Sequence, residues 1–88
     1  MNYVILISGR GSNLQALLDA NLPGHCAAVI SNRPQAAGLA LAAARGVPTA
    51  VVDDRAFPTR EDFDDALRRE IDRHVPGLVL LAGFMRIL

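Results

Sequence analysis

Apolar runs and helical patterns alternate along this chain of 88 residues. Short, continuous apolar runs predict strands at residues 3–7, 26–30, 49–52 and 78–82. Between them, apolar positions at helical spacing predict helices at residues 13–21 and 36–45. A third helix is predicted to start at Thr59 and to end at Pro76, and residues 53–58 are predicted to form a loop.

The regular alternation of strands and helices, joined by short connections, predicts one architecture. Right-handed crossovers place helices on the two faces of a parallel sheet. We therefore expect an α/β fold with a doubly wound, open, Rossmann-like parallel sheet. An apolar segment follows the last predicted strand and would need a further layer to cover it. Residues 1–88 are thus expected to be the N-terminal part of a single, longer domain.

Charge and cysteine content narrow the possible partners. The nine basic residues, all arginine, balance nine acidic ones, so no net field attracts nucleic acid or an anionic membrane. The N-terminus lacks the pattern of a signal peptide, and no apolar run approaches the roughly 20 residues of a membrane span. We expect a cytoplasmic protein. Cys26 is the single cysteine and has no metal-ligand spacing around it, so neither an internal disulfide nor a metal site is expected.

Residues 7–15, with the sequence I-S-G-R-G-S-N-L-Q, predict a glycine turn between the first strand and the first helix. Gly9 and Gly11 permit positive φ and a close approach of the backbone to a ligand. The helix that follows directs unpaired N–H groups and its positive dipole end at this turn, which favours a phosphate. The alternative is a merely well-capped helix, because Ser12 and Gln15 fit a capping box.

Two common phosphate motifs do not fit this turn. A nucleoside-triphosphate loop requires a lysine, and the chain has none. A dinucleotide fingerprint requires a third glycine where Leu14 stands, and an acidic residue where Ser31 and Asn32 follow the second strand. A site for a single phosphate, such as that of a monophosphate substrate, remains.

Four motifs resemble one enzyme family. G-R-G-S-N-L-Q after the first strand, A-V-I-S-N-R near residue 30, T-R-E-D-F-D from Thr59 and L-A-G-F-M-R-I-L at the end recur in order. Together they resemble the N-terminal half of the glycinamide ribonucleotide transformylases (phosphoribosylglycinamide formyltransferases). The resemblance implies formyl transfer from 10-formyltetrahydrofolate to the amine of glycinamide ribonucleotide, in purine biosynthesis. The ribonucleotide carries one phosphate, in agreement with the turn.

The resemblance also implies roles for individual residues. Gly11, Ser12 and Asn13 match the family's binding site for the substrate phosphate and ribose, and Arg60 matches a folate-contacting arginine. The family's pterin-pocket segment matches Met85, Arg86, Ile87 and Leu88. The family's catalytic asparagine, histidine and aspartate lie beyond residue 88. We therefore assign no catalytic residue here and expect the 88-residue chain alone to be inactive.

Two other functions remain open at this point. Formyltetrahydrofolate hydrolase shares the expected fold and folate pocket, but it has no phosphorylated substrate. A non-catalytic, phosphate-binding module of flavodoxin-like shape would bind phosphate without folate. Asp53 and Asp54 follow the third strand and are expected to lie in a solvated loop, and Cys26 is expected to be a small core residue.

Overall fold

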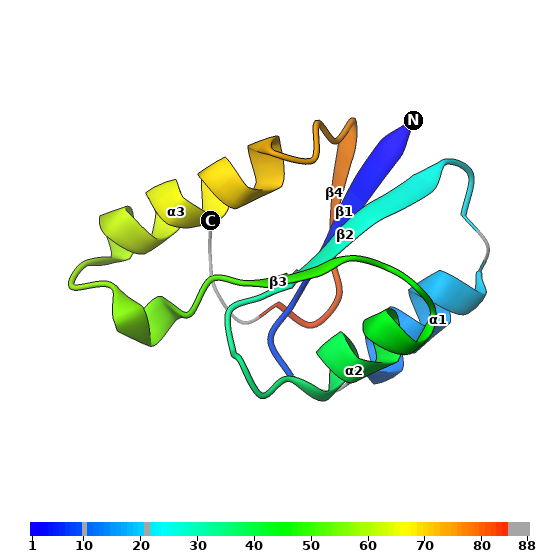
Figure 1. Cartoon of the computed structure of the whole chain (residues 1–88), viewed down its shortest axis with the longest axis horizontal. Coiled ribbons are helices and arrows are strands. Elements are labelled where there is room, and N and C mark those ends of the chain that lie inside the picture. Colours follow the sequence, from blue (N-terminus) through cyan, green and yellow to red (C-terminus); the bar gives the residue numbers. More distant parts are fainter. Residues whose placement is uncertain (10, 21, 85–88) are drawn as a thin grey trace.

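The computed structural model describes residues 1–9, 11–20 and 22–84, and within them the predicted elements are present in the predicted order (Figure 1). The strands are β1 (Asn2–Ile7), β2 (His25–Ser31), β3 (Thr49–Val51) and β4 (Leu78–Leu81). The helices are α1 (Ser12–Asp19), α2 (Ala37–Ala44) and α3 (Arg60–Asp72). The predicted loop contains a short 3-10 helix, η1 (Asp54–Ala56). Three residues are too few to show a helical periodicity in the sequence.

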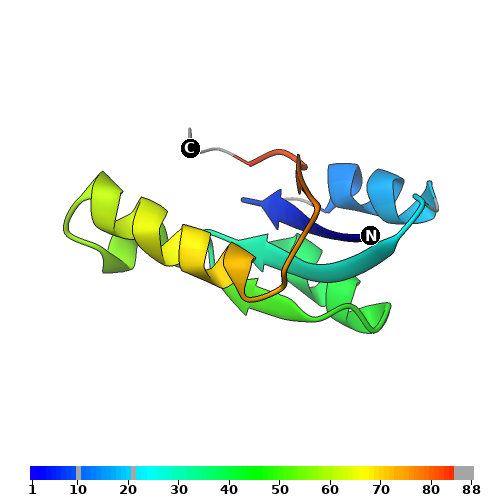
Figure 2. The same ribbon diagram turned by 90° about the horizontal axis from the view of Figure 1, so that it is seen from above.

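The four strands form one parallel sheet in the order β3-β2-β1-β4. From β1 the chain moves outward to β2 and β3, then returns past β1 to add β4 on its other side; Figure 2 shows this order from above. The direction of winding therefore reverses between β1 and β4. In open α/β sheets this reversal opens a crevice at the carboxyl ends of the strands, where ligands bind.

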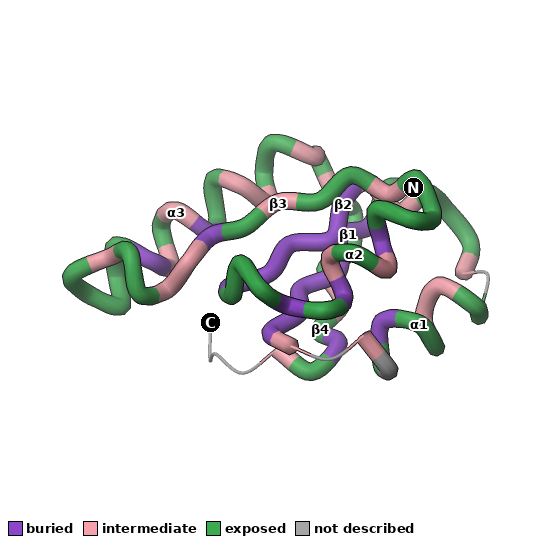
Figure 3. The backbone as a smooth tube through the Cα atoms, turned by 60° about the horizontal axis from the view of Figure 1, so that its bottom comes forward, coloured by how far each residue is buried: buried purple, intermediate pink, exposed green. Residues whose placement is uncertain are grey.

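Helices cover the sheet on both faces, which confirms the doubly wound fold. The residues of β1 alternate between two apolar clusters. Ile5 and Ile7 belong to the cluster beneath α1 and α2, while Val4 and Leu6 belong to the cluster beneath α3. All four side chains are fully buried, so β1 is the centre of the core, as the burial colouring shows (Figure 3).

Helix α3 follows the predicted amphipathic pattern closely. Thr59 is its N-cap, and its hydroxyl oxygen accepts a hydrogen bond from the backbone N–H of Asp62 at 3.1 Å. Phe63 and Leu67 are buried against the sheet. The polar positions on the opposite side are exposed to solvent. The cap and the apolar stripe together determine where this helix begins and which face it buries.

Strand β4 is more exposed than its continuous apolar sequence suggests. Within the described residues it pairs with β1 alone, and Leu78, Val79 and Leu81 are exposed. A continuous apolar run indicates a strand, but it does not say whether a second neighbour is present. None of the described helices is long and apolar enough to cross a membrane.

Candidate functional site

The turn after β1 leads directly into the N-terminus of α1. Gly11 is the N-cap, with φ −89°, and the first turn of the helix holds no acidic residue. Gly11 has no side chain that could cap this end of the helix. The predicted capping box requires Ser12 at the N-cap, but the helix begins one residue earlier, so that Ser12 is already the first helical residue. The first N–H groups of a helix have no partner within the helix, and together with the positive end of the helix dipole they favour an anion at this point.

The two glycines of the turn do not adopt positive φ, which corrects the expectation from the sequence; they leave space that a side chain would fill. Neither Gly9 nor Gly11 has a positive φ. A Cβ on Gly11 would lie 3.3 Å from Leu41 Cδ2 and 3.4 Å from Gly38 Cα, so Gly11 permits close packing of the turn on α2. Among the described residues, a Cβ on Gly9 would meet no atom within 4 Å. Gly9 thus borders open space, and Gly11 does not.

The reversal of winding brings the start of α1 next to the residues that follow β4. The side-chain nitrogen of Asn13 lies 3.5 Å from the position of a Cβ on Gly83, which has φ +74°. After Gly83 the chain crosses to the α3 side of the sheet, where Phe84 packs against the apolar cluster. Asn13 also lines a groove of about 340 Å³ between α1 and the end of β4. The predicted phosphate residues therefore lie at the crevice of the fold.

A second pocket, of about 310 Å³, lies next to the start of α2. Ser8 and Gly9 form one wall, and Arg33 and Arg55 contribute from the segments after β2 and β3. The side chains of both arginines are more than half exposed. Gly9 therefore lines this second pocket, whereas Asn13 lines the groove beside β4.

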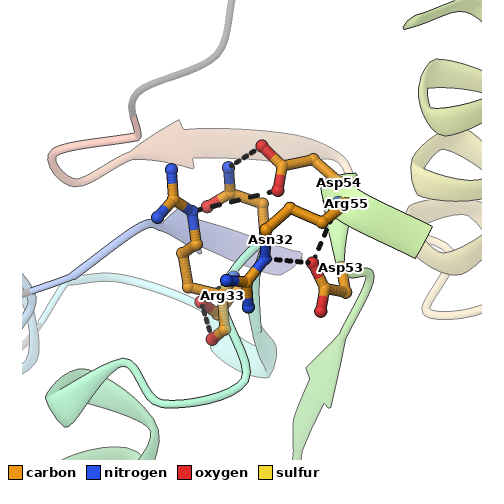
Figure 4. A network of polar contacts seen from close by, with 6 residues as sticks. Asn32, Arg33, Asp53, Asp54 and Arg55 are labelled. Atoms are coloured by element: carbon orange, nitrogen blue, oxygen red, sulfur yellow. Dashed lines mark hydrogen bonds and ion pairs between the residues drawn. The ribbon is translucent and has the colours of Figure 1, made fainter. Parts of the chain in front are cut away.

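A polar network joins the ends of β2 and β3 (Figure 4). Asn32 is 1% exposed, and its side-chain nitrogen donates to Asp54 Oδ2 at 3.4 Å. Asp54 also pairs with Arg33 at 3.9 Å, and its side chain is only 9% exposed. The expectation of a solvated loop is therefore wrong for Asp54, because η1 turns its carboxylate inward onto Asn32.

Asp53 lies at the start of η1 and is more accessible than Asp54. Its carboxylate accepts from the backbone N–H of Arg55 at 3.0 Å and from the guanidinium of the same residue at 3.3 Å. These hydrogen bonds hold the pKa of Asp53 below its ordinary value, so this carboxylate stays ionised at neutral pH.

Arg60, which is expected to contact folate, is not brought next to the phosphate turn, the backbone between Ile7 and Ser12. Arg60 is the first residue of α3, on the opposite face of the sheet from α1, and it pairs with Asp64 at 3.9 Å. The expected pterin-pocket residues Met85, Arg86, Ile87 and Leu88 lie outside the described residues. Their assignment remains a prediction.

The described part of the chain offers binding groups more readily than reactive ones. No group of three or more histidine, cysteine or acidic residues in it is arranged to hold a metal ion. Cys26 packs against the core as expected, and burial raises the pKa of its thiol.

Sequence reasoning missed two glycines at the site, Gly38 and Gly83. Their only signal was a glycine inside an alanine-rich helix and another directly after a strand.

Comparison with known proteins gives a consistent result. The family model described as formyl transferase matches residues 1–88. Phosphoribosylglycinamide formyltransferase of Escherichia coli (strain K12) is 49% identical over 92 residues, which cover 100% of this chain and 43% of that protein. The human trifunctional purine biosynthetic protein adenosine-3 is 43% identical over 88 residues, which cover 96% of this chain and 9% of that protein.

The solved structure of phosphoribosylglycinamide formyltransferase from Coxiella burnetii superposes with a TM-score of 0.92 at 45% identity. The match covers 100% of this chain and 43% of that one. A glycinamide ribonucleotide transformylase from Symbiobacterium toebii also gives a TM-score of 0.92, at 43% identity, with 99% of this chain and 43% of that one covered. The chain thus spans less than half the length of these formyltransferases. On sequence and fold together, it belongs to the formyl transferase family.

Proposed function

We propose that this chain provides the substrate-phosphate site of a phosphoribosylglycinamide formyltransferase. The reaction transfers the formyl group of 10-formyltetrahydrofolate to the amine of glycinamide ribonucleotide, in purine biosynthesis. One observation carries the proposal: the N-terminus of α1, whose N-cap residue is Gly11, lies at the winding reversal, next to Gly83. The names of the relatives support the choice of substrate.

The phosphate is bound by the start of α1. Backbone N–H groups of Gly11, Ser12 and Asn13 donate to its oxygens, and the exposed side chain of Asn13 reaches the ribose. Each charge-assisted hydrogen bond contributes about 1.5–3 kcal/mol. The helix dipole adds about 0.3–1 kcal/mol. No side chain of the chain needs to carry a positive charge for this binding, because the backbone provides the donors.

The folate co-substrate is bound by a second group of residues. Arg60 contacts the folate, and the segment of Met85, Arg86, Ile87 and Leu88 lines the pterin pocket. The apolar side chains of Met85, Ile87 and Leu88 enclose the ring, while backbone groups contact its polar edge. The substrate amine attacks the formyl carbon, and the bond from that carbon to the folate nitrogen breaks. The amine loses a proton and the folate nitrogen gains one. Residues beyond position 88 supply the proton transfer and the stabilisation of the oxyanion.

A titration with glycinamide ribonucleotide tests the phosphate site. In 15N–1H spectra of the chain, we expect the amide signals of residues 11–13 to shift with the ribonucleotide and with inorganic phosphate. The dephosphorylated ribonucleoside should leave them in place. Equal shifts with the ribonucleotide and with the dephosphorylated ribonucleoside would contradict a phosphate site. A protein that binds folate but not the ribonucleotide would favour the hydrolase. A full-length protein that binds phosphate but not folate would favour a sensor module.

The variant Gly9→Ala tests phosphate binding without a change in packing. Its Cβ enters open space, so we expect unchanged thermal stability and weaker phosphate binding, because the methyl group occupies the approach to the turn. Gly11→Val is a poorer test, since its side chain would press on Leu41 and Gly38 and lower stability as well as binding. Wild-type phosphate affinity in Gly9→Ala would place the ligand away from Gly9.

A further inference from the structure

We infer that Gly38, in the first turn of α2, is a positioning residue for the phosphate turn; this inference rests on the proposed function. Gly38 is buried where α2 meets the end of β1 and the start of α1. A Cβ on Gly38 would lie 2.6 Å from Ile7 Cδ1 and 3.2 Å from Leu14 Cδ2. Separations this short force the neighbouring atoms to move.

Ile7 and Leu14 lie on either side of the phosphate turn in the sequence. Ile7 is the last residue of β1, and Leu14 lies in the first turn of α1. Both are fully buried, so neither side chain has solvent to move into. A methyl group at position 38 therefore forces the side chains of Ile7 and Leu14 out of their packed rotamers or shifts the backbone on either side of the turn.

Gly38 also holds the turn through its own backbone. Its N–H donates to the carbonyl oxygen of Gly9 at 3.4 Å. A Cβ on Gly11 would lie 3.4 Å from Gly38 Cα, so the backbones of the turn and of α2 approach closely. Helix α2 thereby supports the turn from the side away from β4, and it sets the direction in which the N–H groups at the start of α1 point.

Helix propensity supports a spatial reason for this glycine. Helix α2 has the sequence A-G-L-A-L-A-A-A, in which alanine is the common residue. Glycine inside a helix is less favourable than alanine. The absence of room for a Cβ explains why position 38 does not hold the better helix former.

The test compares two glycine variants of the same helix region. Gly38→Ala adds a methyl group against Ile7 and Leu14, whereas Gly46→Ala adds one in open space at a φ of +74°. Both variants carry strain, but only the first reaches the turn. We expect Gly38→Ala to bind inorganic phosphate about tenfold more weakly, the scale of one lost charge-assisted hydrogen bond, and Gly46→Ala to bind as wild type. Equal phosphate affinity in the two variants would overturn the inference.

A second-site change gives an independent measurement. Ile7→Val removes the Cδ1 atom that Gly38→Ala would strike, while Leu14 Cδ2 remains at 3.2 Å. We expect the double variant to bind phosphate with an affinity between those of Gly38→Ala and Ile7→Val. If Gly38→Ala alone does not fold, the double variant is compared with Ile7→Val, and equal phosphate affinity would overturn the inference.

Amide spectra without ligand separate this inference from the proposed function. Gly38→Ala should shift the signals of residues 9 and 11–13, and Gly46→Ala should leave them in place. If no protein in the series binds phosphate, the proposed phosphate site fails, while these shifts still decide whether Gly38 positions the turn. Unshifted turn signals in Gly38→Ala would overturn the positioning role.

Discussion

The side-chain nitrogen of Asn13 lies 3.5 Å from the position that a Cβ atom would take on Gly83. The two residues belong to segments that leave adjacent strands for opposite faces of the sheet. Gly83 has φ +74°, a conformation in which residues with a side chain are strained. The conformation of Gly83 thus shapes the wall of the crevice that faces Asn13.

Gly83→Ala should lower the free energy of unfolding by about 1–2 kcal/mol, because alanine is strained in the left-handed region. Urea denaturation checks this value. Gly83→Asn should lose less, since asparagine tolerates this region better than alanine does. Gly9→Ala is the control and should be nearly neutral, because Gly9 has no positive φ and its Cβ would meet no atom of the described part of the chain within 4 Å. Equal stability of Gly83→Ala and Gly9→Ala would contradict the prediction.

The N-cap of α3 offers a local test of helix formation. Thr59→Ala removes the acceptor of the Asp62 N–H and should cost about 1 kcal/mol of unfolding free energy. Thr59 is exposed, so little packing is lost with it. Thr59→Ser keeps the hydroxyl group and should retain most of the stability. Chemical denaturation of both variants distinguishes a cap from a passive surface residue, for which the two losses would be equal.

The order of elements was predictable because each one carries a local signal. Continuous apolar runs indicated the strands, and Thr59 with the stripe of Phe63 and Leu67 indicated α3. The exposure of β4 was not predictable, because neighbours in a sheet come from distant parts of a chain. The same limit applies to the order β3-β2-β1-β4, which depends on pairing between segments rather than on any one of them.

The candidate site was predictable in position but not in detail. The glycine turn pointed correctly to the carboxyl end of β1 and the start of α1. The reason given for Gly11 was wrong, because its need for space arises from Gly38 and Leu41 on a helix more than 20 residues away in sequence. The inward position of Asp54 likewise depends on Asn32, which belongs to another strand end. Contacts of this kind leave no local pattern.

The contact between Asn32 and Asp54 makes a pH-dependent prediction. Asn32→Asp places a second carboxylate in a nearly buried site beside the first. Two adjacent carboxylates cannot both ionise easily, so the folded protein holds one proton at a pKa above the ordinary value. The variant should therefore lose about 1–3 kcal/mol of unfolding free energy at pH 7, the cost of an unsatisfied buried polar group. The loss should shrink as the pH falls toward about 4, where the unfolded chain also binds the proton.

The reciprocal change is the control for this prediction. Asp54→Asn in the Asn32→Asp background restores one carboxylate and one amide at the contact, and it should recover most of the stability at pH 7. Urea denaturation at pH 4 and pH 7 measures all three variants. A loss that does not depend on pH would indicate a steric effect in place of carboxylate repulsion.

Alkaline pH should destabilise the fold through two paired residues of β1 and β2. Tyr3 and Cys26 are register partners, and burial raises the pKa of both side chains, with the Cys26 thiolate adding to the shift of Tyr3. Groups whose pKa is raised by folding stabilise the protein fully below their unfolded pKa and lose that contribution as the pH rises through the folded pKa. The free energy of unfolding should therefore begin to fall near pH 9, the ordinary range of the thiol, and fall further above pH 10 with the phenol.

Two variants and one reaction separate the two groups. Cys26→Ala should flatten the decline that begins near pH 9, and Tyr3→Phe should flatten the part above pH 10, both measured by urea denaturation. Alkylation by iodoacetamide at pH 9 should be slower for folded chain than for chain unfolded in urea, because the thiolate is the reacting species. Equal alkylation rates would show that burial does not hold the proton on Cys26, and the early part of the decline would then need another titrating group.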